Sequence, residues 1–323
     1  MNNSTQTRTE RLSGPAPLTI GPLESAVDGC YAEPVRSYFA HYGLTADDGC
    51  EHFFGTFDSG PFTLAGHLFR PADCQGTVVL LHGYLNHSGQ MQHLIRYLTA
   101  RGFAAAVFDL PGHGHSSGQA AAIDSFDQYV QAVDDFLAAL RLRLTDPMSM
   151  LGFSLGGAIA MQMLARDPAL FEKVILAAPL VHWTLYEQSK NTYKVYSQFT
   201  DRIRRFHQKN SSDKAYLTFN RTQDYLHCQS ISLSWVKALF DWNERIEAMR
   251  PCEAPLLVLQ GDKDRTVEWR YNLKLIGKTF PNAQIDIIDG ARHELFNEAP
   301  PLRNQALKKA AAFFNPQPCD VNA

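Results

Sequence analysis

A serine flanked by glycines stands where an apolar strand pattern gives way to an apolar helix pattern. The strand pattern is MSMLGF at 148–153, and the helix pattern begins directly after Ser154. A serine in the motif G-x-S-x-G at such a corner points its hydroxyl beyond the end of the strand, and the glycines leave room for the neighbouring strand and helix. Ser154 is therefore a candidate nucleophile. Tight packing of strand against helix would explain the glycines but does not require a serine.

A serine hydroxyl becomes a strong nucleophile only when a histidine accepts its proton and a carboxylate orients that histidine. Both residue types follow Ser154 in the chain. Asp262 and Asp264 stand after the apolar run LLVLQG, and His293 lies in a loop after the last expected strand. Asp289 is a weaker third candidate for the acid, and spacing alone does not separate Asp262 from Asp264. Because these residues all follow strands, we expect them to meet at one edge of the sheet.

Catalysis by such a serine also needs N–H groups that stabilise the oxyanion of the tetrahedral intermediate. One is expected from the backbone of Leu155, the residue after the candidate nucleophile. The other is expected from the backbone of Tyr84, which follows Gly83 in the loop after the apolar run TVVLL. His82 in the same loop is interpreted as a structural hydrogen-bonding residue rather than a second base.

Other motifs and the composition favour neither a cofactor nor a metal, and they argue against nucleic acid. The glycine-rich stretch at 111–118 runs into a loop and not into a helix, which argues against a dinucleotide site. His113 and His115 have no third ligand at a suitable spacing, so a tight turn is favoured over a metal site. The net charge of −3 gives no basic surface for nucleic acid. The six cysteines are widely scattered and are expected to be free thiols in a reducing compartment.

The elements that would position these residues alternate between strand and helix patterns. Strand patterns fall at 62–71, 77–83, 104–112, 148–153, 173–179, 254–261 and 283–289, and helix patterns at 90–100, 124–144, 155–166, 269–280 and 300–315. Most of the strand patterns are apolar throughout, which is typical of parallel strands buried on both faces. The sequence therefore predicts an α/β protein with a mostly parallel central sheet flanked by helices.

Two parts of the chain depart from this alternation. Residues 181–250 are rich in aromatic and charged residues and contain no buried-strand pattern, so we expect a helical cap or lid over the strand ends. Residues 1–35 have no clear period and are expected to form a flexible or loosely docked N-terminal arm. The core would then comprise residues 36–180 and 251–323.

Five segments together resemble the monoacylglycerol lipases and bacterial lysophospholipases of the α/β-hydrolase superfamily. They are HGYLNHSG (82–89), DLPGHGHSSG (109–118), GFSLGG (152–157), GDKDRTV (261–267) and GARHELFNE (290–298). The resemblance implies an α/β-hydrolase fold, and it selects Asp264 over Asp262 as the acid. Phe153 departs from the histidine that is common before the serine in this family, and Leu110-Pro111 replaces a more polar pair.

The resemblance implies a cofactor-free serine hydrolase that cleaves carboxylic esters of monoacyl lipids, either lysophospholipids or monoacylglycerols, through an acyl-enzyme. A short-chain carboxylesterase, thioesterase or peptidase would carry the same catalytic residues and stays an alternative, as does a binding protein that keeps the fold without turnover. Two interpretations would explain the composition of the cap. It could form an acyl channel whose cations lie near lipid head groups, or it could have a normal core and a solvated basic face. The residues in question are Trp183, Tyr186, Tyr193, Tyr196, Phe199, Phe206, Tyr216, Phe219 and Tyr225, with Arg202, Arg204, Arg205 and Lys209.

The start of the sequence, MNNSTQTRTERLSGPAP, is polar and lacks the apolar segment of a signal peptide. No apolar run approaches the roughly 18 residues that a membrane span requires. We therefore expect a cytoplasmic protein, with peripheral contact to the inner face of the membrane through the cap as an open alternative.

Overall fold

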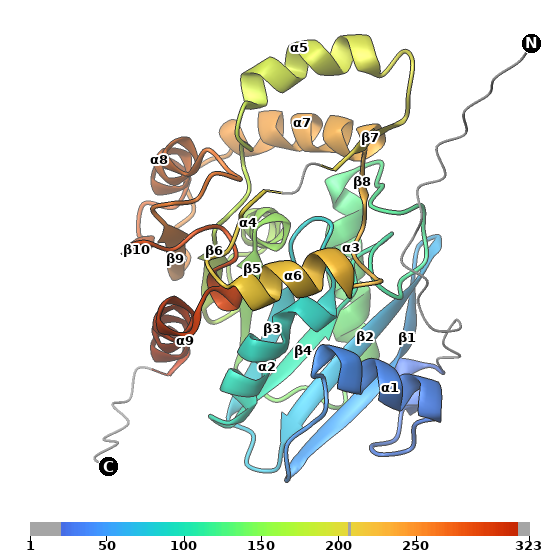
Figure 1. Ribbon diagram of the computed structural model, residues 1–323. Coiled ribbons are helices and arrows are strands. Elements are labelled where there is room, and N and C mark those ends of the chain that lie inside the picture. Colours follow the sequence, from blue (N-terminus) through green and yellow to red (C-terminus); the bar gives the residue numbers. More distant parts are fainter. Residues whose placement is uncertain (1–20, 206–207, 316–323) are drawn as a thin grey trace, which may run out of the picture.

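An eight-stranded sheet forms the centre of the protein (Figure 1). The structure is a computed structural model that describes residues 21–205 and 208–315. Across the sheet the strands are β1 (Cys50–Ser59), β2 (Phe62–Pro71), β4 (Phe103–Phe108), β3 (Gly76–Leu81), β5 (Met148–Phe153), β6 (Val174–Ala177), β9 (Leu256–Gly261) and β10 (Gln284–Ile288). Strand β2 is antiparallel to both its neighbours, β1 and β4, and every pair from β4 to β10 is parallel. The predicted fold class, a mostly parallel sheet of the α/β-hydrolase type, is confirmed.

Helices cover both faces of this sheet. On one face lie α1 (Glu33–Tyr42), α2 (Gln92–Thr99) and α9 (Pro300–Phe314), and on the other α3 (Phe126–Leu140), α4 (Leu155–Arg166) and α8 (Trp269–Thr279). Short 3₁₀ helices lie at η1 (Leu23–Ser25), η2 (Ser88–Met91) and η3 (Leu295–Asn297). The helices and the sheet thus form three layers with an apolar core on each side of the sheet.

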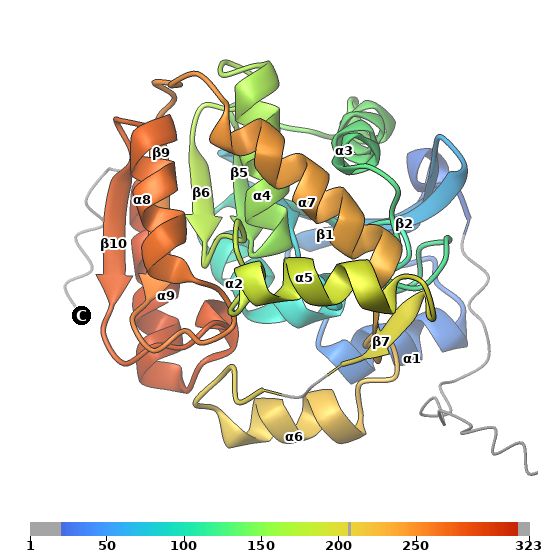
Figure 2. The ribbon, with the colours of Figure 1, turned by 90° about the horizontal axis from the view of Figure 1, so that it is seen from above.

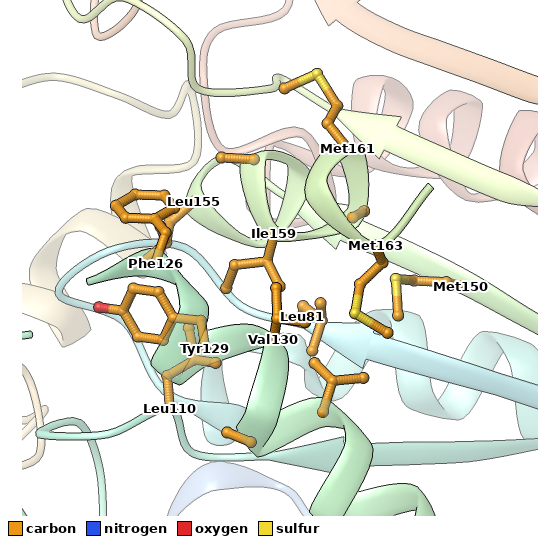
Figure 3. Packing of buried hydrophobic residues seen from close by; sticks show 14 of the residues in the cluster. Leu81, Leu110, Phe126, Tyr129, Val130, Met150, Leu155, Ile159, Met161 and Met163 are labelled. Carbon is orange, nitrogen blue, oxygen red and sulfur yellow. The ribbon is translucent and has the colours of Figure 1, made fainter. Parts of the chain in front are cut away.

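Strand β3 explains why the central strands have no polar face. Val79 and Leu81 belong to the core shared with α3 and α4, whereas Val78 and Leu80 belong to the core shared with α2, and all four are fully buried. Successive side chains on a strand alternate between its faces, so a continuous apolar run fills both cores. Figure 3 shows Leu81 in the layer beneath Ile159 of α4. Each such burial contributes about 1.5–3 kcal/mol to folding.

Between β6 and β9 the chain leaves the sheet and lies across its top (Figure 2). This insertion, residues 181–250, contains α5 (Tyr186–Tyr196), β7 (Arg202–Arg204), α6 (Lys214–Thr222), β8 (Ser230–Ser232) and α7 (Leu233–Glu247). Strands β7 and β8 pair antiparallel in a small sheet of their own. The prediction of helices and loops alone for this segment is wrong for these two strands, because three residues are too few to produce a strand pattern.

The N-terminal region contains two elements that the patterns do not indicate, α1 and β1. Strand β1 mixes polar and aromatic residues and lies at the edge of the sheet. Residues 1–20 of the expected arm lie outside the described residues, as do Phe206 and Cys319. Residues 22–23 are docked, because Pro22 forms a bridge with Thr56 and the side chain of Leu23 is fully buried.

Within the described part of the chain, no helix combines the length and apolarity needed to cross a bilayer. The described cysteines form no disulfide bonds.

We expect the protein to lose stability between pH 7.5 and pH 5. Burial lowers the pKa of His67 to about 3, so this side chain stays neutral in the folded protein. In the unfolded chain a histidine takes up a proton below its ordinary pKa of about 6.5, which favours unfolding by about 2 kcal/mol at pH 5. Burial likewise lowers the pKa of His52, His82, His93, His113, His115 and His182.

Two histidines oppose this trend. Against the effect of burial, Asp224 raises the pKa of His87 and Asp264 raises that of His293, so both contribute stability that is present below pH 6.5. Because more histidines have lowered than raised pKa values, we expect acidification to reduce the stability of the folded protein. Thermal melts at pH 7.5 and pH 5 measure the net loss, and His67→Gln should make it smaller. Equal melting temperatures at the two pH values would contradict this account.

Candidate active site

Ser154 occupies a strained corner between β5 and α4. Strand β5 ends at Phe153 and α4 begins at Leu155, so Ser154 alone makes the turn, with φ 51° and ψ −108°. A non-glycine residue at positive φ costs about 1–3 kcal/mol and persists only where its surroundings fix it. Here the N–H of Ser154 donates to the carbonyl of Ala177 at 2.9 Å, and its own carbonyl accepts from the N–H of Leu180 at 3.0 Å.

The glycines beside Ser154 are required by close backbone approach. A Cβ atom at Gly152 would lie 2.2 Å from the carbonyl oxygen of Gly156, and a Cβ at Gly156 would lie 2.2 Å from that of Leu81. Any side chain at either position would therefore push α4 away from β5 or β3. The motif G-x-S-x-G is thus explained at its two outer positions by packing, and the serine is left as the one position that packing does not dictate.

The structure brings together the three residues that the sequence analysis selected. The Nε2 atom of His293 lies 3.1 Å from Oγ of Ser154, and its Nδ1 lies 2.8 Å from Oδ2 of Asp264. Only 6 %, 4 % and 6 % of the surfaces of Ser154, His293 and Asp264 are exposed. The hydroxyl, the imidazole and the carboxylate therefore form one continuous hydrogen-bonded chain that is largely shielded from water.

The hydrogen bond to His293 distinguishes Asp264 from Asp262. Its Oδ1 accepts from the N–H of Thr266 at 2.7 Å, and its Oδ2 accepts from Nε2 of Gln260 at 3.1 Å as well as from His293. Asp262 instead accepts from the N–H of Gly290 at 2.7 Å and pairs with the neighbouring lysine at the surface. The buried aspartate is therefore the one that can orient the histidine, and Asp262 fixes the start of the loop that carries it.

Electrostatics place a proton between His293 and Asp264. Burial alone would raise the pKa of Asp264, but the interaction with His293 and the donors around the carboxylate lower it overall. Burial would lower the pKa of His293, yet the charge of Asp264 and its hydrogen bond raise it. The charged Asp264 accepts a hydrogen bond from Nδ1–H, so the ring proton stays on Nδ1 and Nε2 of the neutral ring is the acceptor that faces Ser154.

Two backbone N–H groups beside Ser154 are candidates for the oxyanion site. Leu155 is the first residue of α4, and the N–H groups of the first helical turn have no partner within their helix. Gly83 lies against Ser154, because a Cβ atom at Gly83 would be 3.3 Å from Cβ of Ser154, and Tyr84 follows it. Neither the N–H of Tyr84 nor that of Leu155 donates to another backbone carbonyl in the described ranges.

The side chain of Tyr84 joins the loop after β3 (residues 82–87, the β3 loop) to the insertion. Its hydroxyl donates to the carbonyl of Ala121 at 2.8 Å and accepts from the N–H of Ser232 at 3.1 Å. Its ring stacks on Trp235 of α7 at a centroid distance of 3.5 Å. The position of the Tyr84 backbone is thus tied to the insertion above it.

The remaining histidines near the site have structural partners. His82 accepts at Nε2 from the N–H of Leu110 at 3.0 Å, and burial lowers its pKa to about 3, so it is held neutral beneath the β3 loop. His113 is buried and its Nδ1 lies 2.9 Å from the carbonyl of Pro111, within its own turn. Among the described residues, no group of three or more histidines, cysteines or acidic residues could hold a metal ion.

Several polar residues that support the site were not predicted from the sequence. Gln260 lies inside an apolar strand, is fully buried and donates to Asp264. Glu294 and Glu298 follow His293 and are buried at 3 % and 0 % exposure. A glutamine within the run LLVLQG, and acidic residues within the largely apolar stretch after the histidine, are signals that could have identified them.

The fold and the arrangement of its serine, histidine and aspartate define an α/β hydrolase. A family profile described as serine aminopeptidase, S33, matches residues 72–300, which is more than half of the chain. The chain belongs to this family, and it is therefore a hydrolase.

The chain is similar in sequence to lipases of the family that the five motifs resemble. A monoacylglycerol lipase of Mycolicibacterium smegmatis is 26% identical over 244 residues, covering 70% of this chain and 84% of that protein. The phospholipase YtpA of Bacillus subtilis is 29% identical over 256 residues, covering 73% and 93%. The human monoglyceride lipase is 28% identical over 242 residues, covering 70% and 78%. The predicted similarity to monoacylglycerol lipases and lysophospholipases is confirmed.

Solved structures agree on the fold. A soluble variant of the monoglyceride lipase of Saccharomyces cerevisiae superposes with a TM-score of 0.70 at 17% identity, covering 81% of this chain and 94% of that one. The monoacylglycerol lipase of Paleococcus ferrophilus gives a TM-score of 0.68 at 24% identity, covering 77% and 97%.

Asp264 and Asp262 form a matched pair of variants. Asp264→Asn should lower the hydrolysis of p-nitrophenyl butyrate by about 10³- to 10⁴-fold, because an amide cannot hold the histidine in the required tautomer. Asp262→Asn removes the same charge from a residue that does not touch His293, and its side-chain oxygen can still accept from the N–H of Gly290, so the rate should stay close to that of the unmodified protein. Equal losses in both variants would show that the contact between Asp264 and His293 does not matter for the reaction.

Proposed function

We propose that the protein is a serine hydrolase that cleaves carboxylic esters of monoacyl lipids. The observation that carries the proposal is the buried chain of hydrogen bonds from Asp264 through His293 to Ser154. Membership of the family and the names of the relatives support the reaction class.

In the proposed acylation step, Oγ of Ser154 attacks the carbonyl carbon of the ester while Nε2 of His293 takes the hydroxyl proton. The N–H groups of Leu155 and Tyr84 stabilise the negative charge that develops on the carbonyl oxygen. The bond to the leaving alcohol then breaks, and His293 gives its proton to the alkoxide oxygen. The acyl group remains on Ser154 as an ester, and Asp264 stabilises the imidazolium that exists between the two proton transfers.

Deacylation repeats the same chemistry with water as the nucleophile. His293 takes a proton from the water, the resulting hydroxide attacks the acyl carbon, and the proton passes to Oγ of Ser154 as the bond to the serine breaks. The products are a free carboxylic acid and the regenerated serine. The ester and one water molecule supply every atom of the two products.

The choice of a monoacyl lipid rests on the relatives and on the insertion. The relatives include lipases of monoacylglycerols and a phospholipase. We propose that the insertion serves as a cap whose aromatic side chains offer apolar surface to an acyl chain. In the insertion, Trp183 and Tyr193 pack on Phe240 at centroid distances of 5.4 and 5.6 Å, so part of its aromatic content forms a core of its own.

Contact between the cap and a lipid surface is supported by exposed apolar residues near the end of α5. Val195, Tyr196 and Phe199 are 57%, 52% and 82% exposed. Arg204 and Lys209 are exposed in the same insertion and could meet anionic head groups. We propose that this face touches the membrane from which the substrate is taken.

A soluble ester, thioester or peptide substrate is the second candidate. The family description, serine aminopeptidase, is the observation that keeps a peptidase in view. The catalytic residues would be the same, and the substrates would differ only in the pocket that receives them.

A substrate panel separates these candidates. We expect kcat/KM to be higher for long-chain monoacylglycerols or lysophospholipids than for p-nitrophenyl acetate or aminopeptidase substrates. Ser154→Ala should abolish all of it, which marks the activity as that of the site and not of a contaminant. Higher kcat/KM for the short ester or for a peptide would contradict the lipid proposal, and turnover that survives in Ser154→Ala would contradict the mechanism.

Binding to vesicles tests the membrane face. The protein should co-sediment with phosphatidylcholine vesicles containing anionic phosphatidylglycerol, and Phe199→Ser should reduce the bound fraction because a highly exposed aromatic side chain is lost. The variant Leu142→Ser is the matched control, since Leu142 is 88% exposed but lies in the turn after α3 and outside the insertion. Equal reductions in both variants, or no binding at all, would contradict a membrane face on the cap.

A further inference from the structure

The loop that carries His293 is fixed on both sides of the histidine. The N–H of Arg292 donates to a carboxylate oxygen of Glu298. The N–H of Glu294 donates to the carbonyl of Asn210 at 3.0 Å, and Asn210 belongs to the insertion. One of the two backbone contacts that flank the histidine is thus supplied by a segment far from it in the sequence.

The carboxylate of Glu294 connects three segments of the chain. Its Oε1 accepts from Nδ2 of Asn86 and from Nδ2 of Asn210, each at 3.2 Å. Its Oε2 accepts from Nδ2 of Asn297 at 3.2 Å. Asn86 lies in the β3 loop, where its own N–H donates to the carbonyl of Gly83 at 3.1 Å. The β3 loop, the histidine loop (residues 290–299) and the insertion therefore meet at one side chain.

Further hydrogen bonds hold the same segment of the insertion, residues 209–212, on the histidine loop. Ser211 donates through Oγ to the carbonyl of Asn297 at 2.7 Å. Ser212 donates through its N–H and its hydroxyl to Glu298, the same carboxylate that accepts from Arg292. Because Ser211 and Glu298 are fully buried, water does not compete for these contacts.

Glu294 is an unusual choice for a purely structural position. Its side-chain donors are neutral amides, and a buried carboxylate held by amides costs more to bury than a neutral side chain. Its charge lies next to His293 in the chain and helps to raise the pKa of that histidine, together with Asp264 and against Arg205. Arg205 and Tyr216, both in the insertion, are further titratable groups that interact with this carboxylate.

We propose that Glu294 is a positioning residue that aligns His293 with the β3 loop, so that the triad and the N–H of Tyr84 are in register only while residues 209–212 are docked. The proposal rests on the proposed function, because it concerns the same catalytic histidine. It assigns to the insertion a second role besides covering the substrate, namely holding the catalytic residues in place.

The experiment compares Glu294→Gln, Asn86→Ala and the surface control Glu253→Gln, with kcat, KM and the pH profile of kcat/KM measured on p-nitrophenyl butyrate. A small loss of alignment has large effects on rate, so kcat should fall about tenfold or more in the first two variants with little change in KM. The acid limb of the profile reports the pKa of His293 in the enzyme without substrate. It should move to lower pH in Glu294→Gln and stay in place in Asn86→Ala. Glu253 is exposed and remote from the site, so its variant should match the unmodified protein.

The outcomes separate this inference from the proposed function. An unmodified protein without ester turnover would refute the proposed function itself. Normal turnover with unchanged kcat and an unchanged acid limb in Glu294→Gln would overturn the inference alone, as would a rise in KM at constant kcat. If Glu294→Gln does not fold, Asn86→Ala and Asn210→Ala decide instead: a tenfold loss of kcat in each supports the inference, and wild-type kcat in both overturns it.

Discussion

At the corner between β5 and α4 the chain leaves space for almost no side-chain atoms. The close approach of α4 to β3 and β5 is possible only with glycine at positions 152 and 156, and it holds Ser154 at a positive φ. This strain fixes the direction of the hydroxyl, so every other part of the site must come to it. The β3 loop, the acid after β9 and the histidine after β10 do so because parallel strands end at the same edge of the sheet.

A second requirement is a charged carboxylate in a buried place. Asp264 meets it because Gln260, the backbone at Thr266 and His293 all donate to it, and these donors outweigh the effect of burial on its pKa. Asp262 is closer to the surface, and it contacts Gly290, the first residue of the histidine loop. Two aspartates of one short loop thus take different roles because of what surrounds them.

Most strands and helices of the core, and the candidate site residues, could be predicted because they depend on local patterns: apolar runs of strand length, helical spacing, and residues placed directly after strands. The strands β7 and β8, the edge strand β1 and the partners of Glu294 could not. Their positions depend on contacts between segments such as 82–87, 209–212 and 290–299, and neither period nor composition encodes such contacts. The choice between Asp262 and Asp264 also needed more than spacing, since both follow the same strand.

The central claim, that Ser154 is activated by His293, is tested most directly by intact-mass analysis after incubation with a fluorophosphonate. The account predicts one covalent adduct on the unmodified protein and none, under the same conditions, on Ser154→Ala or His293→Ala. A folded protein that forms no adduct, or an adduct that persists in Ser154→Ala, would contradict it.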